Sequence, residues 1–166
     1  AAAFPFLGRW STERPGEWRA GLRYCLRVGA RARCLGDEEQ EAEAWHYAAW
    51  QRYNGAAYRP GVHSARRALA VRQRVLGPDH PDVASATNNL GSLLQAQGDL
   101  AGARPYLERA LAVWERVLGP DHPDVATATN NLGMLLQAQG DLPVARPYLE
   151  RALAVKERVL GPDHPD

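Results

Sequence analysis

Apolar residues recur every three or four positions along most of this chain, a spacing that places them on one face of an α-helix. One stripe consists of Val83, Ala86, Leu90, Leu93 and Leu94, and the next of Ala103, Leu107, Ala110, Leu111, Trp114 and Leu118. Between them, Gln97-Gly98-Asp99 predicts a turn, because Gly98 can end a helix in a left-handed conformation. The alternation typical of a half-buried strand is absent. The pattern therefore predicts pairs of helices joined by turns.

These helix pairs recur with a fixed period. The string Val-Leu-Gly-Pro-Asp-His-Pro-Asp occurs at 75–82, 117–124 and 159–166, a spacing of 42 residues. The stretches that end on the second and third strings, 83–124 and 125–166, are identical at 37 of 42 positions. A period of this length is found in propeller blades, in HEAT or armadillo units and in other helical hairpin repeats. The helical spacing favours a hairpin repeat.

Small residues at fixed places distinguish among the helical repeats. The order Leu-Gly-x-x-Leu, then Ala-x-x-x-Leu-x-x-Ala, occurs at Leu90, Gly91, Leu94, Ala103, Leu107 and Ala110, and again at Leu132, Gly133, Leu136, Ala145, Leu149 and Ala152. It is similar to the tetratricopeptide pattern, in which small residues let the two helices approach closely. It departs at Thr87 and Thr129, where the family often has Trp, as the first repeat does at Trp45. The added length of each repeat resembles the kinesin-light-chain type.

This resemblance implies an all-α fold, an α-α superhelix (a TPR solenoid) of antiparallel helical hairpins with a 42-residue period. We expect an N-terminal helical cap or linker at 1–40, with a helix near 17–34. A divergent first repeat at 41–82 and two near-copies at 83–124 and 125–166 are expected to follow.

Two local features carry expectations of their own. Pro105 and Pro147 fall more than a turn inside the second helix of their repeats, which predicts a late or bent start of that helix. Trp114 is replaced by Arg72 in the first repeat and by Lys156 in the third. A position that takes these residues tolerates solvent, so we expect the indole to be partly exposed or to contact another chain.

Charge and composition narrow the choice of partners. The 166 residues carry 20 basic and 19 acidic side chains, and a net charge of +1 creates no field that would attract nucleic acid or anionic lipid. Cys25 and Cys34 fit neither a Cys-x-x-Cys site nor a disulfide framework, which predicts a reducing, cytoplasmic location. No apolar run suits a membrane span or signal peptide, so we expect a soluble chain without a membrane partner.

The first forty residues carry two further features. Arg19, Arg23, Arg27 and Arg31 form a basic stripe, which is either a solvated face or a docking surface for an acidic domain or a phosphate backbone. The Ala-Ala-Phe-Pro stretch at 2–5, with Trp10 and the following helix, looks like the junction after the nucleotide-binding part of bacterial STAND or NB-ARC-type NTPases. That resemblance implies a sensor arm. The sequence has no Gly-x-x-x-x-Gly-Lys-Ser/Thr loop, so we interpret it as a piece of a larger protein whose NTPase would lie elsewhere.

Side chains that could carry chemistry are few. The recurrent clusters of metal-capable residues are the Asp-His-Pro-Asp strings at 79–82 and its two copies. We interpret them as helix-start loops, because adjacent residues rarely converge on one ion. His46 and His63 lack companions at ligand spacing, and no Ser or Cys has the context of a nucleophile. We therefore expect no catalytic residue, no metal and no cofactor.

The family resemblance places the binding surface on the first helix of each repeat, which lines the concave groove. The predicted groove residues are Glu43, His46, Tyr47, Trp50 and Tyr53 in the first repeat, Ser85, Asn88, Asn89, Ser92 and Gln95 in the second, and Thr127, Asn130, Asn131, Met134 and Gln137 in the third. We expect Asn88 and Asn130 to hold a ligand's main chain and Met134 to offer a side-chain contact. For Asn89 and Asn131, packing against a neighbouring helix and exposure are equally open.

Three functions follow from these features. The leading one is a protein–protein interaction module, the ligand-sensing arm of a STAND-type signalling NTPase, which binds a peptide, a protein or its own NTPase domain. The second is an assembly scaffold that stacks head to tail through its uncapped third repeat. The third is nucleic-acid contact through the arginine helix at 19–31, against which the near-neutral charge argues.

Overall fold

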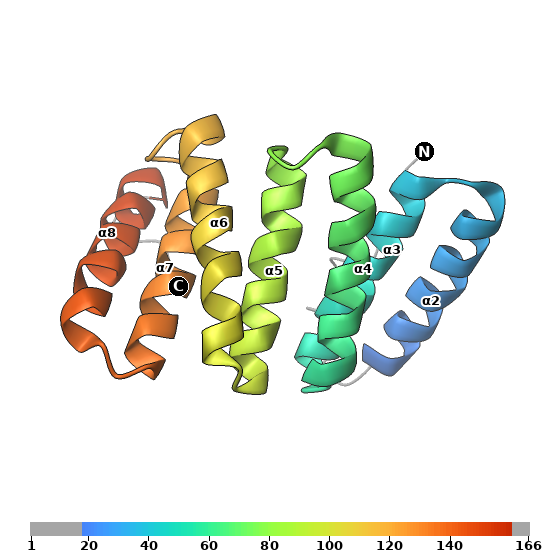
Figure 1. Cartoon of the computed structure of the whole chain (residues 1–166), viewed down its shortest axis with the longest axis horizontal. Coiled ribbons are helices and arrows are strands. Elements are labelled where there is room, and N and C mark those ends of the chain that lie inside the picture. The colour runs from blue at the N-terminus through green and yellow to red at the C-terminus, as the bar shows by residue number, and fades with distance from the viewer. Residues whose placement is uncertain (1–17, 161–166) are drawn as a thin grey trace. The chain divides into compact units, whose positions relative to one another are not determined.

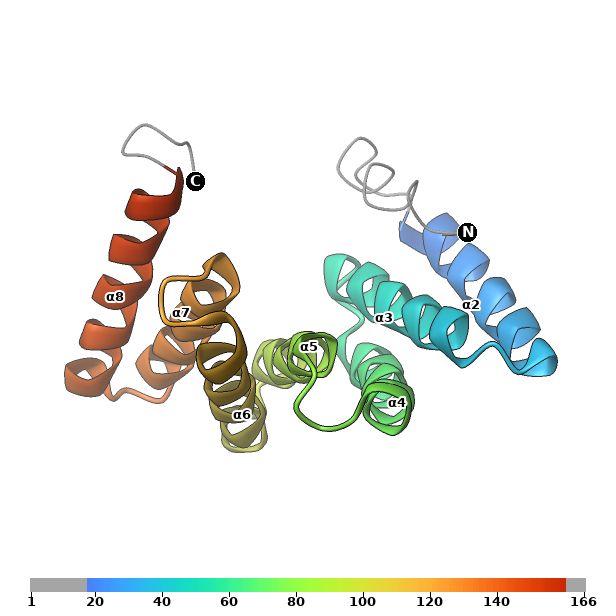
Figure 2. The same cartoon turned by 90° about the horizontal axis from the view of Figure 1, so that it is seen from above.

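The computed structural model describes residues 18–160, which form seven α-helices and no strand (Figures 1 and 2). The helices are α2 (Trp18–Leu35), α3 (Glu38–Asn54), α4 (Tyr58–Leu76), α5 (Pro81–Gln97), α6 (Leu100–Leu118), α7 (Pro123–Ala138) and α8 (Leu142–Leu160). The predicted all-α fold is confirmed, and the helix expected near 17–34 is α2. The Ala-Ala-Phe-Pro stretch at 2–5 and Trp10 lie outside the described residues.

The chain divides into two compact units, Ala1–Ala86 and Thr87–Asp166. In the first unit α3 packs against both α2 and α4, and in the second α7 packs against both α6 and α8. Neighbouring helices within each unit run antiparallel and are joined by loops of only two to four residues (Figure 1). Loops this short force consecutive helices to pack as hairpins.

The helix limits repeat with the period of the sequence. Helices α4, α6 and α8 begin at Tyr58, Leu100 and Leu142, which are 42 residues apart, and each contains 19 residues. The turn predicted at 97–99 is confirmed, because α5 ends at Gln97 and Gly98 follows with φ +91°. A side chain at that φ would strain the backbone, which is why glycine occupies this position.

The helix starts are capped by side chains that accept hydrogen bonds from the first backbone N–H groups. Asp99 Oδ1 accepts from the N–H of Gly102 at 2.9 Å. In the Asp-His-Pro-Asp strings the imidazole of the histidine is the cap. Nδ1 of His80 accepts a hydrogen bond from the backbone N–H of Asp82, and Nδ1 of His122 accepts one from that of Asp124, both at 3.1 Å. These two copies are therefore helix starts, as the sequence predicts.

Glycine allows the closest helix contact of the hairpins. A Cβ atom added at Gly91 would lie 2.6 Å from Cδ2 of Leu107, and one at Gly133 would lie 2.7 Å from Cδ2 of Leu149. Both distances are too short for two carbon atoms. The small residue of the sequence pattern is thus required where the first helix of a hairpin meets the second.

In the first unit, α2 and α3 share a small buried core. Cys25, Ala44 and Ala48 are buried together, and Leu22, Val28 and Tyr47 pack against them. Burial raises the pKa of the Cys25 thiol to about 11, so this cysteine is an apolar core residue.

For the second helices, the expected exposure of Trp114 and the expected late start are both wrong, whereas the alternative of a bent start stays a prediction. Trp114 is only 4% exposed, because it continues the buried stripe of α6 one turn beyond Ala110. Arg72, its counterpart, is itself partly buried, so the substitutions at this position do not report exposure to solvent. Helix α6 begins at Leu100 with Pro105 inside it, so its start is not late; the Asp99 cap holds the first turn ahead of the proline.

Candidate functional site

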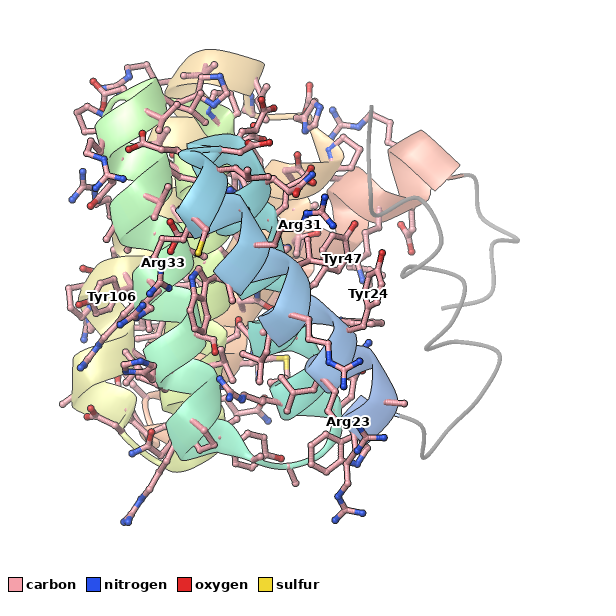
Figure 3. All side chains as sticks on the ribbon, turned by 90° about the vertical axis from the view of Figure 1, so that its right-hand side faces the viewer. Arg23, Tyr24, Arg31, Arg33, Tyr47 and Tyr106 are labelled. Carbon is pink, nitrogen blue, oxygen red and sulfur yellow. The ribbon has the colours of Figure 1, made fainter. Side chains whose placement is uncertain are left out.

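Five predicted groove residues lie on α3 in the first unit, and all of them reach solvent at least in part. They are Glu43, His46, Tyr47, Trp50 and Tyr53, whose spacing of three and four residues places them along one side of the helix. Figure 3 shows Tyr47 on the same side of the first unit as Tyr24 of α2, while Arg33 points to the other side. Tyr24, which is exposed, adds a third phenol that the sequence pattern did not indicate.

His46 takes part in a polar network with the two following helices. Nη1 of Arg72 on α4 lies 3.4 Å from Nδ1 of His46 and also donates to the backbone carbonyl of Asp82 on α5 at 3.4 Å. Burial, and to a lesser extent the charge of Arg72, lower the pKa of His46 to about 4, while the charge of Asp82 opposes the shift. His46 is therefore neutral at pH 7 and accepts from the guanidinium.

In the second unit the amides of the two asparagine pairs bond to each other. Asn131 on α7 donates from Nδ2 to Oδ1 of Asn88 at 3.1 Å and to Oγ of Ser92 at 3.5 Å, both on α5. Asn88 is 5% exposed. The expectation that Asn88 faces a ligand is therefore wrong, because its side chain is buried and its Oδ1 accepts from Asn131 of α7. For Asn131 the structure supports the packing interpretation.

The other member of the second pair faces solvent. Asn130 is partly exposed and donates from Nδ2 to Sδ of Met134 at 3.4 Å, one turn further along α7. Met134 is 50% exposed. Thr127 and Gln137 are exposed on the same helix, and Ser85, Asn89, Ser92 and Gln95 of α5 are partly exposed. The residues on α7 thus form an accessible, uncharged surface around one flexible apolar side chain.

A cleft opens at one edge of the first unit, at a place that the sequence analysis missed. Its volume is about 160 Å³. It lies where the start of α3, the end of α4 and the start of α5 meet, and it is lined by Glu38, Glu39, Ala42, Glu43, Arg72, Val75, Leu76 and Asp82. The available signal was the unusual density of glutamates in the first turns of α3, a turn before the predicted groove begins.

Neither metal chemistry nor a membrane span is supported by the described part of the chain. Residues 18–160 contain no group of three or more His, Cys, Asp and Glu side chains that could hold a metal ion. No helix in the same range has the length and apolar content needed to cross a bilayer. Arg19, Arg23, Arg27 and Arg31 are all exposed on α2, as the stripe predicts.

The repeats of this chain are similar to those of known proteins. A family model described as tetratricopeptide repeat matches residues 61–111 and 82–158. None of the curated proteins matches the chain. Among solved structures, a variant of a Podosopora anserina protein described as a kinesin light chain with nearly identical TPR-like repeats is 21% identical, with a TM-score of 0.79 over 96% of this chain and 76% of its own.

Two further structures share the fold. BtubC (BKLC) from P. vanneervenii is 23% identical, with a TM-score of 0.70 over 87% of this chain, and this chain spans 59% of its length. MamA is 16% identical, with a TM-score of 0.54 over 92% of this chain and 85% of its own. At sequence identities this low, the similarity to these structures concerns the fold alone.

Proposed function

Because the chain belongs to the tetratricopeptide repeat family, we propose that it is a protein–protein interaction module that binds an extended peptide on the solvent-facing side of α7. Tetratricopeptide repeats generally mediate protein–protein interaction through such surfaces. The observation that carries the proposal is the pairing of Asn130 with the half-exposed Met134.

The chemistry of this surface suits the main chain of a peptide. The Asn130 side chain offers both a donor and an acceptor, and its present partner is a thioether, a weak acceptor that a peptide carbonyl can replace. Met134 supplies a flexible apolar contact for a ligand side chain. Behind them, the bonds from Asn131 to Asn88 and Ser92 fix α7 against α5, which holds the surface in place before binding.

A peptide-display selection against the whole chain tests this proposal. The enriched peptides are then titrated against the parent chain and against Asn130→Ala and Met134→Ser; the second change introduces the residue that the preceding repeat has at the same position, Ser92. We expect Asn130→Ala to weaken binding about tenfold, as the loss of one or two hydrogen bonds predicts, and Met134→Ser to change which peptides bind. Glu108→Gln, an exposed change on α6, is the matched control. Peptides that bind both α7 variants like the parent chain contradict the proposal.

The proposal extends to the wider role that the sequence suggests. In it, the chain is the cytoplasmic, non-enzymatic sensor arm of a STAND-type signalling NTPase, and the ligand is a protein trigger or the NTPase's own domain. The support is the resemblance of the first forty residues, together with the repeats that follow. A phosphate-binding loop encoded upstream in the same gene supports this extension, and a gene without one removes it while leaving peptide binding intact.

A specific observation also favours the second function, head-to-tail assembly. Three apolar side chains of α8 are exposed, namely Leu142, Val144 and Leu153. Their counterparts in α6 are Leu100 and Gly102, which are partly buried, and Leu111, which is buried. In this alternative the face of α8 packs on another copy of the chain. Sedimentation of the parent chain and of Leu153→Gln over a wide concentration range tests it, since assembly through α8 must weaken in the variant.

A further inference from the structure

We propose that the cleft of the first unit is a second binding site, specific for a lysine or arginine side chain that a partner protein presents beside an apolar residue. The site is separate from the α7 surface, and its occupant is a short basic peptide segment.

The size and lining of the cleft fit one long side chain. A volume of about 160 Å³ is similar to that of cavities of about 150 Å³ that hold a benzene-sized group. Ala42, Val75 and Leu76 supply apolar walls, and the last two are exposed. The aliphatic stem of a lysine or arginine can lie along such walls while its charged end reaches the acidic rim.

Negative charge dominates the lining. Glu38, Glu39, Glu43 and Asp82 contribute four carboxylates against the single guanidinium of Arg72. That guanidinium is already directed toward His46 and the carbonyl of Asp82. Glu38 is paired with Arg74 at 2.7 Å, and Oδ2 of Asp82 lies 3.7 Å from Nδ1 of His80, so Glu39 and Glu43 are the carboxylates that a cation entering the cleft would meet first.

The environment of Glu43 shows the same surplus of negative charge. Burial raises the pKa of its carboxyl, and Glu39, Asp37 and Asp82 raise it further, against the opposing charge of Arg72. A bound cation would relieve this repulsion. The described residues hold no group suited to a metal ion, so an organic cation fits the cleft better.

The other repeats carry different residues at the positions that line this cleft. The positions of Glu38, Glu39 and Glu43 are occupied in the second repeat by His80, Pro81 and Ser85, and in the third by His122, Pro123 and Thr127. The position of Arg72 is Trp114, whose indole is buried. Thus the first repeat has carboxylates where its copies have His, Pro and Ser or Thr, and it has the guanidinium of Arg72 where the second repeat has a buried indole.

The probe for this site is a pair of blocked pentapeptides, Ala-Leu-Lys-Leu-Ala and the same peptide with norleucine in place of lysine. The two differ only in the ammonium group. Titration into the isotopically labelled chain, followed by backbone amide shifts, gives both the affinity and the location. We expect the lysine peptide to shift the amides of Glu39, Glu43 and Arg72 and the norleucine peptide to bind about tenfold more weakly, as the loss of a charge-assisted bond predicts.

Variants of the cleft provide the second half of the test. Glu39→Gln combined with Glu43→Gln keeps the shape and removes charge, and should weaken the lysine peptide about fivefold. Arg72→Trp introduces the residue of the second repeat and should abolish binding by filling the cleft. Glu108→Gln with Glu115→Gln removes the same charge from α6 and should leave binding unchanged. If Arg72→Trp fails to fold, as a melting curve would show, the glutamine pair still decides.

Three results would overturn the proposal. One is equal binding of the lysine and norleucine peptides, and another is an unchanged affinity in the double glutamine variant. The third is self-association of the parent chain that the double glutamine variant loses, because the basic side chain would then come from a second copy. Asn130→Ala changes the α7 surface and leaves this cleft intact. A failure of the cleft proposal can therefore be distinguished from a failure of the α7 proposal.

Discussion

Leu111 and Leu153 occupy the same position in two helices of nearly identical sequence, yet Leu111 is 7% exposed and Leu153 is 53% exposed. Helix α6, which carries Leu111, packs against α7, whereas no described helix follows α8. The burial of this leucine is thus decided by its neighbour in the stack and not by its own sequence.

The two leucines should therefore respond differently to the same change. We expect Leu111→Ala to lower the free energy of unfolding by about 3 kcal/mol, since it leaves a cavity, and Leu153→Ala to lower it by less than about 0.5 kcal/mol. Urea denaturation at low protein concentration measures both. A large effect of Leu153→Ala under these conditions would show that the α8 face is covered within the single chain.

The bond between Asn88 and Asn131 should contribute to stability. Asn88→Ala removes the nearer of the two acceptors of the Asn131 amide and leaves the longer bond to Ser92, and we expect a loss of about 1 kcal/mol in the free energy of unfolding. Asn130, which is adjacent to Asn131 on α7, faces solvent, so Asn130→Ala should change the free energy of unfolding by less than about 0.5 kcal/mol. The double variant Asn88→Ala with Asn131→Ala measures the coupling, and additive losses would mean that the two amides do not interact in solution.

Acid should destabilise the first unit through His46. Its folded-state pKa of about 4 lies below the ordinary 6.5, so the folded chain resists protonation there. The stabilisation is complete above pH 6.5 and is lost as the pH falls from 6.5 to 4, by at most about 3 kcal/mol.

The replacement His46→Asn isolates this effect, because the other repeats have Asn88 and Asn130 at the same position. The raised pKa of Glu43 acts in the opposite direction, adding stability as the pH falls, and it is common to both proteins. We expect the free energy of unfolding to depend less on pH in the variant between pH 7 and 4. Parallel pH profiles would mean that His46 has the same pKa in the folded and the unfolded chain.

A buried amide in the first unit should be replaceable by an apolar side chain. Gln51 is buried, and its Oε1 has no hydrogen-bond partner among the described residues. The other repeats carry leucine at this position, Leu93 and Leu135. We expect Gln51→Leu to raise the free energy of unfolding by about 1 kcal/mol, measured by urea denaturation. Gly21→Ala is the contrasting change, because its Cβ would lie 2.7 Å from Nε2 of Gln51, and it should destabilise. A destabilising Gln51→Leu would show that the amide has a partner in solution.

The features of this fold that the sequence predicts are local ones. A helical spacing of apolar residues, a glycine at a helix end and a small residue at a close contact are each determined within a few positions, and α2, Gly98 and Gly91 agree with them. The 42-residue period then repeats these local features, so that α4, α6 and α8 begin at equivalent positions.

The errors concern contacts between residues far apart in the chain. Asn88 and Asn131 are 43 positions apart, and which asparagine of a pair turns inward depends on how α5 and α7 are rotated against each other. The exposure of Trp114 was inferred from the polarity of Arg72 and Lys156, but long side chains can be half-buried along their stems. The acidic cleft was missed because three segments of the chain, from α3, α4 and α5, each contribute only part of its lining.

The 42-residue spacing of the helix limits has a genetic consequence. Because α6 and α8 begin and end in the same frame, unequal recombination between 83–124 and 125–166 inserts or removes one complete hairpin without shifting a helix boundary. The newly joined helices inherit matching contact faces, since the residues that form them are already shared by both copies. A gene with such near-copies can change the number of its repeats in a single event, so the extent of the surface changes in steps of one hairpin.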